Sequence, residues 1–284
     1  MSIIQNNISR LQKLAQNGVV THRGHFHADD ILSAALLKIA GVIPDVHVVQ
    51  RIGRVAPNFN GLAFDIGEGE FDHHQEGATF RENGVKYASF GLIWNSIGAE
   101  YVMKKYDTTS YDAQLIAKKF DDDFVASMDL TDNFGQSNYP NTLAFLIGTR
   151  NNGNFVKDQR DDLFYELSDR FCVHLESMIK SAYESIDYKN RAIEISNLNT
   201  TGIVFFGDNV FIPRSAFIGT KIKCLIKFSR GAYNVTTIEP YKIDPSFIKM
   251  PGCIQVWETG AAFKTLVNAK NAATAFVKQN NNSK

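Results

Sequence analysis

Histidines and aspartates gather in two short segments near the start of the chain. The segment THRGHFHADD (residues 21–30) contains three histidines and two aspartates, and FDHHQEG (residues 71–77) contains an aspartate followed by two histidines. Carboxylate oxygens suit hard divalent ions such as Mn²⁺ and Mg²⁺, and neutral imidazole binds many transition metals. If the fold brings the two segments together, we expect a site for metal-dependent chemistry.

The predicted strands and helix around these two segments indicate that the fold brings the segments together. Short apolar runs bounded by Gly, Pro and Asn indicate three buried strands: GVVTH (18–22), VHVVQ (46–50) and GLAFDI (61–66). Apolar residues recur at helical spacing between the first two strands, and Gly41 supplies a stop signal. Strand, helix, strand predicts a parallel sheet, whose ligands bind beyond the carboxyl ends of the strands. His22 and Asp65, each near the end of a predicted strand, are therefore expected at one edge with residues 72–74.

The remaining pattern predicts an α/β fold in two domains. Helical spacing covers residues 88–105, 111–131, 141–149 and 159–187. After residue 190 the chain changes to closely spaced strand-like runs, GIVFF, NVFIP, KIKCLIKFS, AYNVTTIE and CIQVWE, followed by a helical tail from about Phe263 to Val277. We expect an N-terminal parallel-sheet domain with crossover helices over 1–190 and a smaller mixed α/β domain over 198–284. The boundary is placed in the polar stretch 188–198.

The charge balance and the cysteine content limit which binding partners and which cellular compartment we expect. Thirty basic and thirty acidic residues balance in a chain of 284, so any polyanionic partner has to be held locally rather than by a global field. Three widely spaced cysteines argue against a disulfide framework and favour a reducing compartment such as the cytoplasm. No run approaches the roughly 18 apolar residues of a membrane span. Residues 1–18 lack acids and could form a mitochondrial transit peptide, but an amphipathic helix packed on the body is the favoured interpretation.

Four motifs resemble the melanocyte-proliferating-gene (Myg) family. They are THRGHFHADDILSAALL, LAFDIGEGEFDHHQ, KYASFGLIWNSIG and FVASMDLTDN, and they occur in the order of that family through most of residues 18–190. The family is one of DHH-type metal-dependent hydrolases related to RecJ-like exonucleases and family II inorganic pyrophosphatases. The resemblance implies two divalent ions, usually manganese with magnesium as the alternative, bridged by an aspartate.

The resemblance also implies a role for individual residues. The implied metal ligands are His22, His27, Asp29, Asp65, His73 and Asp129. In the last motif either Asp129 or Asp132 could be the ligand, and we prefer Asp129. Asp72 is expected to orient the imidazole of His73, and His74 to face the substrate. Lys86 is either a phosphate contact or a solvated lysine before a helix.

The C-terminal segment PGCIQVWETGAAFKT resembles part of the substrate domain of the family. Gly260 remains there, but Phe263 and Lys264 stand where paired glycines are expected, so Lys264 could supply a charge in place of bare backbone. Lys227 and Arg230 of KIKCLIKFSR either face an anionic substrate or lie on an exposed sheet face. Gly260, Lys264, Lys227 and Arg230 are therefore the candidate substrate-binding residues.

These features predict a metal-dependent phosphoesterase that hydrolyses phosphodiester bonds, an exonuclease on short or single-stranded RNA or DNA. Two alternatives stay open. One is a phosphatase of a small nucleotide, dinucleotide or pyrophosphate-type compound. The other is an inactive relative that binds nucleic acid or nucleotides, suggested by the altered C-terminal loop. A homodimer is compatible with the sequence, and neither the natural substrate nor the polarity of trimming follows from it.

Overall fold

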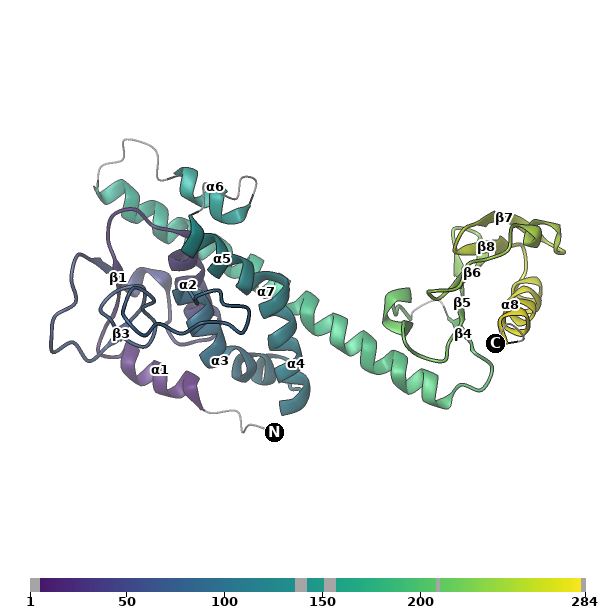
Figure 1. Ribbon diagram of the computed structural model, residues 1–284, viewed down its shortest axis with the longest axis horizontal. Coiled ribbons are helices and arrows are strands. Elements are labelled where there is room, and N and C mark those ends of the chain that lie inside the picture. Colours follow the sequence, from purple (N-terminus) through teal and green to yellow (C-terminus); the bar gives the residue numbers. More distant parts are fainter. Residues whose placement is uncertain (1–5, 136–141, 151–156, 208–209, 282–284) are drawn as a thin grey trace. The chain divides into compact units, whose positions relative to one another are not determined.

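The computed structural model describes residues 6–135, 142–150, 157–207 and 210–281 (Figure 1). The chain divides into two compact units, Met1–Tyr183 and Glu184–Lys284. The helix α7 (Lys157–Leu198) spans this division. The polar stretch 188–198, where we expected the boundary, is therefore the helical end of α7.

A three-stranded parallel sheet lies in the first unit. Its strands β1 (Val19–His22), β2 (Val49–Ile52) and β3 (Leu62–Ala63) have the order β2-β1-β3, and Val19 pairs with both Val49 and Leu62. The helix α2 (Ala28–Ile39) connects β1 and β2, as the strand–helix–strand pattern predicted. The second strand begins later than expected because residues 46–48 form a 3-10 turn (η1, Val46–Val48), capped by the carboxylate of Asp45.

Besides α2 and α7, the described part of this unit contains further α-helices. They are α1 (Asn7–Ala15), α3 (Ser89–Tyr106), α4 (Ser110–Phe120), α5 (Ala126–Phe134) and α6 (Leu143–Thr149). The predicted helix 111–131 is interrupted by a π-helical turn, η2 (Asp121–Val125), which joins α4 to α5. Such turns are frequent at functional sites because the extra residue rotates the side chains that follow. The helix α2 is buried along most of its length, which fixes its N-terminus at the sheet edge.

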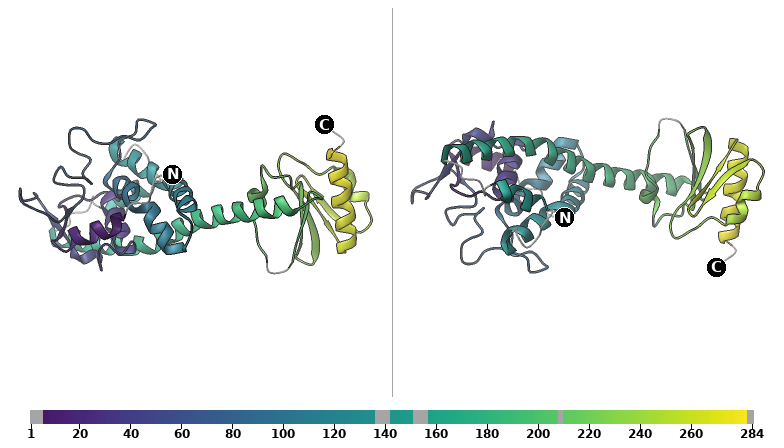
Figure 2. Two further views of the ribbon diagram at one scale, coloured as in Figure 1. Left: turned by 90° about the horizontal axis from the view of Figure 1, so that it is seen from below. Right: turned by 90° about the horizontal axis from the view of Figure 1, so that it is seen from above.

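The second unit is a five-stranded sheet with a helix on one face. The strands are β4 (Ile203–Phe206), β5 (Cys224–Ser229), β6 (Ala232–Thr237), β7 (Cys253–Trp257) and β8 (Gly260–Phe263), in the order β4-β5-β6-β8-β7. Only β4 and β5 pair in parallel. Cys224 and Ile226 pack with residues of α8 (Leu266–Asn281), which lies along the sheet in Figure 2. This confirms the predicted mixed α/β class for the second unit.

Two expectations for the second unit were wrong. Residues 210–213 of NVFIP are irregular and lead into a 3-10 turn, η5 (Arg214–Phe217), while residues 208 and 209 lie outside the described residues. The C-terminal helix begins at Leu266, because residues 260–263 pair with both β6 and β7. A further 3-10 turn, η6 (Pro245–Lys249), precedes β7.

Cys172, Cys224 and Cys253 are all free thiols, as their spacing predicted. Within the described part of the chain, none of the helices combines the length and apolarity that crossing a bilayer requires.

Candidate metal centre

His22 is the last residue of β1, and its ring lies between two carboxylates. Its Nε2 is 2.9 Å from an oxygen of Asp30 and 3.1 Å from an oxygen of Asp65. Its Nδ1 is 3.2 Å from the carbonyl oxygen of Arg23. With the proton on Nδ1 donated to this carbonyl, the Nε2 lone pair is free to bind a cation beside both carboxylates.

Asp65 follows β3 and connects the two sequence segments. Its backbone has φ 54°, in the left-handed region that costs about 1–3 kcal/mol for such a residue, and its N–H donates to the carbonyl oxygen of Phe71 at 2.9 Å. This conformation turns the side chain so that its two oxygens face different rings. One oxygen contacts His22, and the other lies 3.0 Å from Nε2 of His73.

The N-terminus of α2 contributes two adjacent carboxylates with different surroundings. Asp30 accepts hydrogen bonds from the hydroxyl of Thr21 at 3.0 Å and the N–H of His27 at 2.9 Å, so it ties the helix start to the strand end. Asp29 accepts one hydrogen bond, from the N–H of Ser89 at 3.2 Å, and its other oxygen is buried without a hydrogen-bond partner among the described residues. A buried carboxylate oxygen without a donor needs a cation or water to offset its desolvation.

Asp132 completes the cluster from α5. Its oxygens lie 3.6 Å from Nδ1 of His27 and 3.4 Å from Nε2 of His73. Our preference for Asp129 over Asp132 is not supported by this geometry. The carboxylate of Asp129 instead accepts from Nε of Arg81 at 2.7 Å and is fully buried.

The arrangement of Asp72 also differs from expectation. One of its oxygens accepts the N–H of His74 and lies 2.9 Å from Nδ1 of the same ring, and the other accepts the N–H of Glu68 at 2.8 Å. Asp72 therefore orients His74, not His73. The Nδ1 atom of His73 is buried and has no hydrogen-bond partner within the described structure.

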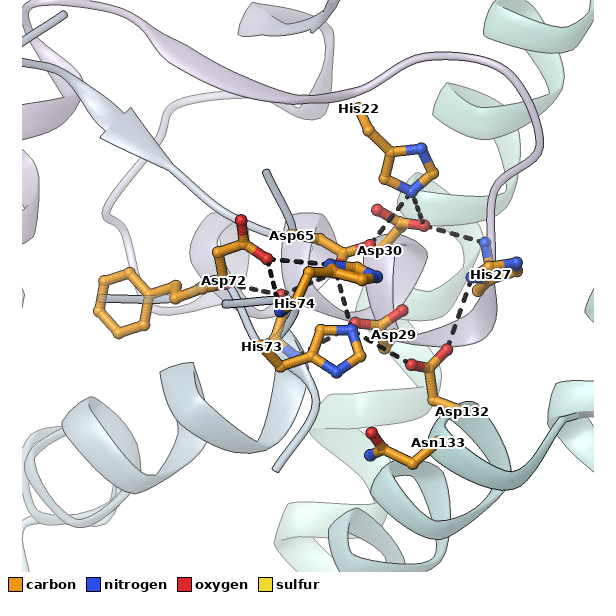
Figure 3. Close-up of polar contacts among 12 residues, drawn as sticks. His22, His27, Asp29, Asp30, Asp65, Asp72, His73, His74, Asp132 and Asn133 are labelled. Carbon is orange, nitrogen blue, oxygen red and sulfur yellow. Dashed lines mark hydrogen bonds and ion pairs between the residues drawn. The ribbon is translucent and has the colours of Figure 1, made fainter. Parts of the chain in front are cut away.

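Together these side chains form one continuous cluster of eight residues (Figure 3). Four overlapping groups of three have ligand atoms within 4.8 Å of one another. Their members are His22, His27, Asp29, Asp30, Asp65, His73, His74 and Asp132. Five of the six predicted metal ligands are among them. The fold thus brings together segments separated by more than 100 residues.

The cluster has an excess of buried negative charge. Burial raises the pKa of Asp29, and the charges of Asp132 and Asp65 raise it further. Burial also raises the pKa of Asp132. For His22, burial favours the neutral ring, but the charges of Asp30 and Asp65 and the hydrogen bonds to them outweigh it and raise its pKa to about 11. A divalent cation bound among these carboxylates would offset their negative charge.

Lys86 and Asn133 lie beside the cluster. Burial and, to a lesser extent, the charge of Lys86 lower the pKa of His73, but the hydrogen bond to Asp65 and the charges of Asp65 and Asp132 outweigh them and raise it overall. The amide of Asn133 donates to the carbonyl oxygens of Lys86 and Asp129, both at 2.8 Å. Asn133 therefore links α5 to the segment that leads into α3.

The four candidate substrate-binding residues of the second unit do not share one environment. A Cβ on Gly260 would lie 2.5 Å from the ring of Trp257 and 2.7 Å from a backbone oxygen, so this glycine is required for packing. The ammonium of Lys227 lies 4.9 Å from the ring centre of Phe211. Lys264 is exposed after β8, and Arg230 is exposed in the β5–β6 turn.

Two members of the cluster were missed in the sequence analysis. Asp30 was left out because the family resemblance assigned only Asp29 of this pair, and in the structure Asp30 also accepts the N–H of His27. Its position directly after Asp29 was the available signal. Asp132 was considered but not preferred. The ion pair of Asp129 with Arg81 joins residues 48 positions apart, so the sequence does not show that the carboxylate of Asp129 already has a partner.

Comparison with known proteins identifies the family. The model of MYG1_exonuc, an uncharacterised protein family (UPF0160), matches residues 18–187, more than half of the chain. The chain therefore belongs to this family, as its four motifs predicted.

Three curated relatives match the chain over about two fifths of their own length. The MYG1 protein of Dictyostelium discoideum is 29% identical over 134 residues, which are 44% of this chain and 40% of the relative. The MYG1 protein YER156C of Saccharomyces cerevisiae is 30% identical over 146 residues, 47% of this chain and 43% of the relative. The MYG1 exonuclease of Homo sapiens is 27% identical over 142 residues, 44% of this chain and 38% of the relative.

Among solved structures, an exonuclease RecJ bound to manganese matches with 11% identity and a TM-score of 0.30, over 98% of this chain and 96% of that chain. The RecJ of Thermus thermophilus in complex with Mn²⁺ matches with 10% identity and a TM-score of 0.27, over 98% of this chain and 56% of that chain. A likeness at this level carries no argument about fold or activity.

Proposed function

We propose that the chain is a divalent-metal-dependent phosphodiesterase that releases nucleotides from the ends of short or single-stranded RNA or DNA. The observation that carries the proposal is the meeting of four aspartates and four histidines from both motif segments and α5. The name of the human relative, an exonuclease, supports this choice of reaction, and the carboxylate and imidazole donors suit manganese or magnesium as the cofactor.

The chemistry of the cluster fits two divalent ions. Asp65 presents one oxygen to His22 and the other to His73, so it has the position of a bridging ligand. The unpartnered oxygen of Asp29 adds a hard donor that lacks a hydrogen bond from the described residues. We assign the ligands as His22, His27, Asp29, Asp65, His73 and Asp132. Ions bound there would activate water for attack on phosphorus and offset charge on the phosphoryl oxygens.

His74 is proposed to act on the substrate directly. Its side chain is 62% exposed, whereas that of His73 is 6% exposed, and its Nδ1 is held by Asp72. Since Asp72 accepts the Nδ1 proton, Nε2 is the nitrogen left to hydrogen-bond a phosphoryl oxygen or to give a proton to the leaving oxygen. Lys86 would contribute positive charge near the same phosphoryl group.

The second unit is proposed to bind the polymer. Lys227, Arg230 and Lys264 are cations on or beside its sheet, and Lys227 adjoins the exposed ring of Phe211. Cations interleaved with aromatic faces suit single-stranded nucleic acid because phosphates and bases are bound independently of sequence. Gly260 has no such role in the proposal, since it serves packing.

The experiment that tests this function is manganese-dependent release of mononucleotides from end-labelled short RNA and DNA. His73→Ala is the inactive control, because it removes an imidazole shared by two carboxylates of the cluster. Release by the unmodified protein that disappears in the variant is expected, and the labelled end gives the polarity. A folded, metal-loaded protein that releases nothing from either polymer overturns the exonuclease proposal and leaves small phosphate esters or a non-catalytic binder.

A further inference from the structure

A cavity of about 580 Å³ opens beside the candidate metal centre. Its walls come from residues 53–57 and 59, after β2, and from residues 65–68, after β3. Asp72 and His74 contribute to the same wall, so the cavity adjoins the imidazole that is proposed to meet the substrate. Ligand sites of small molecules have volumes of about 300–1,000 Å³, and this one has room for a single nucleotide.

Part of the cavity wall is apolar. Val55, Ala56, Pro57 and Ile66 line it, and Val55 and Ile66 are only half-buried. Gly67 has φ 94°, and a Cβ there would lie 2.8 Å from a methyl group of Val55. The close approach of this glycine to Val55 packs the two loops against each other. A half-exposed apolar wall of this kind suits the face of a nucleobase.

Two arginines beside this wall have no carboxylate partner among the described residues. Other arginines of the first unit do: Arg10 pairs with Glu70, Arg51 with Asp161 and Arg81 with Asp121. Arg54 lines the cavity itself. Arg23 lies next to Gly53 of the same wall, with its Nε 3.0 Å from the position that a Cβ on Gly53 would occupy. Residues 1–183 carry 17 basic and 23 acidic side chains, a net charge of −6. Unpaired arginines in such an acidic unit are available for an anion.

We infer that this cavity binds one nucleoside monophosphate unit, the terminal nucleotide of the substrate. The base lies against Val55, Pro57 and Ile66, and the phosphate pairs with Arg54. His74, at the other end of the wall, then lies beside the scissile bond. This inference rests on the proposed function for its substrate class, but nucleotide binding by the cavity can be measured without turnover.

The test is a titration of the isotope-labelled full chain with adenosine 5′-monophosphate, followed by NMR, first in EDTA and then with Mg²⁺. Adenosine and inorganic phosphate are titrated in parallel. We expect shifts at residues 53–57 and 66–68 with the nucleotide, and weaker binding of adenosine or phosphate alone. Shifts confined to the second unit, equal binding of inorganic phosphate, or no binding in both conditions would overturn the inference.

Substitutions at one position separate the cavity from the metal centre. Arg54→Ala should weaken nucleotide binding about tenfold, the effect of losing one charge-assisted hydrogen bond, and Arg54→Lys should restore part of it. Arg170→Ala is the matched control, because Arg170 is exposed on α7 and pairs with Glu166 of the same helix. Unchanged binding by Arg54→Ala would contradict the assignment.

The same variants distinguish a wrong cavity from a wrong function. Bis(4-nitrophenyl) phosphate is a phosphodiester without a nucleobase, so its manganese-dependent hydrolysis by the unmodified protein tests the metal centre without the apolar wall, while release of mononucleotides should fall in the Arg54→Ala protein. If both substrates are hydrolysed and Arg54→Ala has no effect, nucleotide binding by the cavity is contradicted and the proposed phosphodiesterase activity stands. If the nucleotide binds at residues 53–57 but neither substrate is hydrolysed, the cavity assignment stands and the proposed phosphodiesterase activity is contradicted.

Discussion

The guanidinium of Arg81 binds the carboxylate of Asp129, with Nε 2.7 Å from Oδ2. The same guanidinium also binds Asp121 of the π-helical turn through both terminal nitrogens. Asp132, one helical turn after Asp129, instead contacts His27 and His73. The two aspartates of DLTDN therefore have different contacts: Asp129 joins α5 to the segment before α3, and Asp132 lies in the candidate metal centre.

Asp132→Asn should reduce the affinity for Mn²⁺ by about 10–100-fold, while Asp129→Asn leaves it within about threefold. The reason is that, of these two aspartates, Asp132 is the one whose carboxylate lies near His27 and His73. Isothermal titration of the metal-free proteins with Mn²⁺ measures both affinities. The opposite order would return the ligand role to Asp129.

Gly91→Ala should destabilise the protein, against the usual gain of about 1 kcal/mol for replacing glycine in a helix. A Cβ at this position of α3 would lie 2.3 and 2.4 Å from the two oxygens of Asp129. The expected loss is about 1–3 kcal/mol of unfolding free energy, measured in urea. In the double variant with Asp129→Ala the penalty should largely vanish, because the carboxylate that blocks the methyl group is gone. A penalty of the same size in both backgrounds would contradict this contact.

The sequence was sufficient for the parts of the site that local patterns determine. The apolar run that ends at His22, the helix after it and the run before Asp65 predicted a parallel sheet with ligands at one edge, and the structure has that sheet. Periodicity gives strands and helices, and topology gives the shared edge.

What the sequence could not give depends on long-range contacts and on side-chain rotation. Arg81 forms an ion pair with Asp129, which is 48 residues away in the sequence, and no local sequence pattern predicts this pair. Asp72 and His73 are adjacent, yet the carboxylate binds the ring of His74, because neighbouring side chains in an irregular loop face directions that backbone dihedrals decide. Residues 260–263 form a strand because two neighbouring strands pair with them, although they directly precede a helical pattern.

Asp129 should make the stability of the protein depend on pH. Burial raises its pKa to about 7, and the charge of Arg81 and its hydrogen bond offset only part of this. Since the folded pKa lies above the ordinary value, the protonated form is favoured by folding. The unfolding free energy should then fall as the pH rises from about 4 to about 7 and stay level above it, by at most about 4 kcal/mol. Asp129→Asn, which cannot ionise, provides the reference. The difference in unfolding free energy between the two proteins, measured by urea denaturation between pH 4.5 and 8, should grow with pH in favour of the variant.

Manganese should stabilise the folded chain. Bound at 100 times its dissociation constant, an ion contributes about 2.7 kcal/mol, which corresponds to roughly 5–10 °C in Tm for a unit of this size. The shift on adding Mn²⁺ to EDTA-treated protein should be larger at pH 8 than at pH 6, because protons compete with the ion for the imidazoles of His22 and His73. Scanning fluorimetry with His73→Ala as the control measures it. An equal shift in the control would place the ion elsewhere.

Asp72→Asn should lower kcat with little change in the affinity for Mn²⁺. The carboxylate of Asp72 binds Nδ1 of His74, and asparagine in its place can favour the other tautomer, which puts the proton on the nitrogen that should meet the substrate. A loss of about 10–100-fold is expected, close to that of His74→Ala, and the double variant should be hardly worse than either single one, because the two residues act as a unit. Steady-state rates of mononucleotide release, with metal titrations of the same proteins, measure this. If Asp72 instead orients His73, as the family resemblance implied, Asp72→Asn will weaken Mn²⁺ binding and its effect will add to that of His74→Ala.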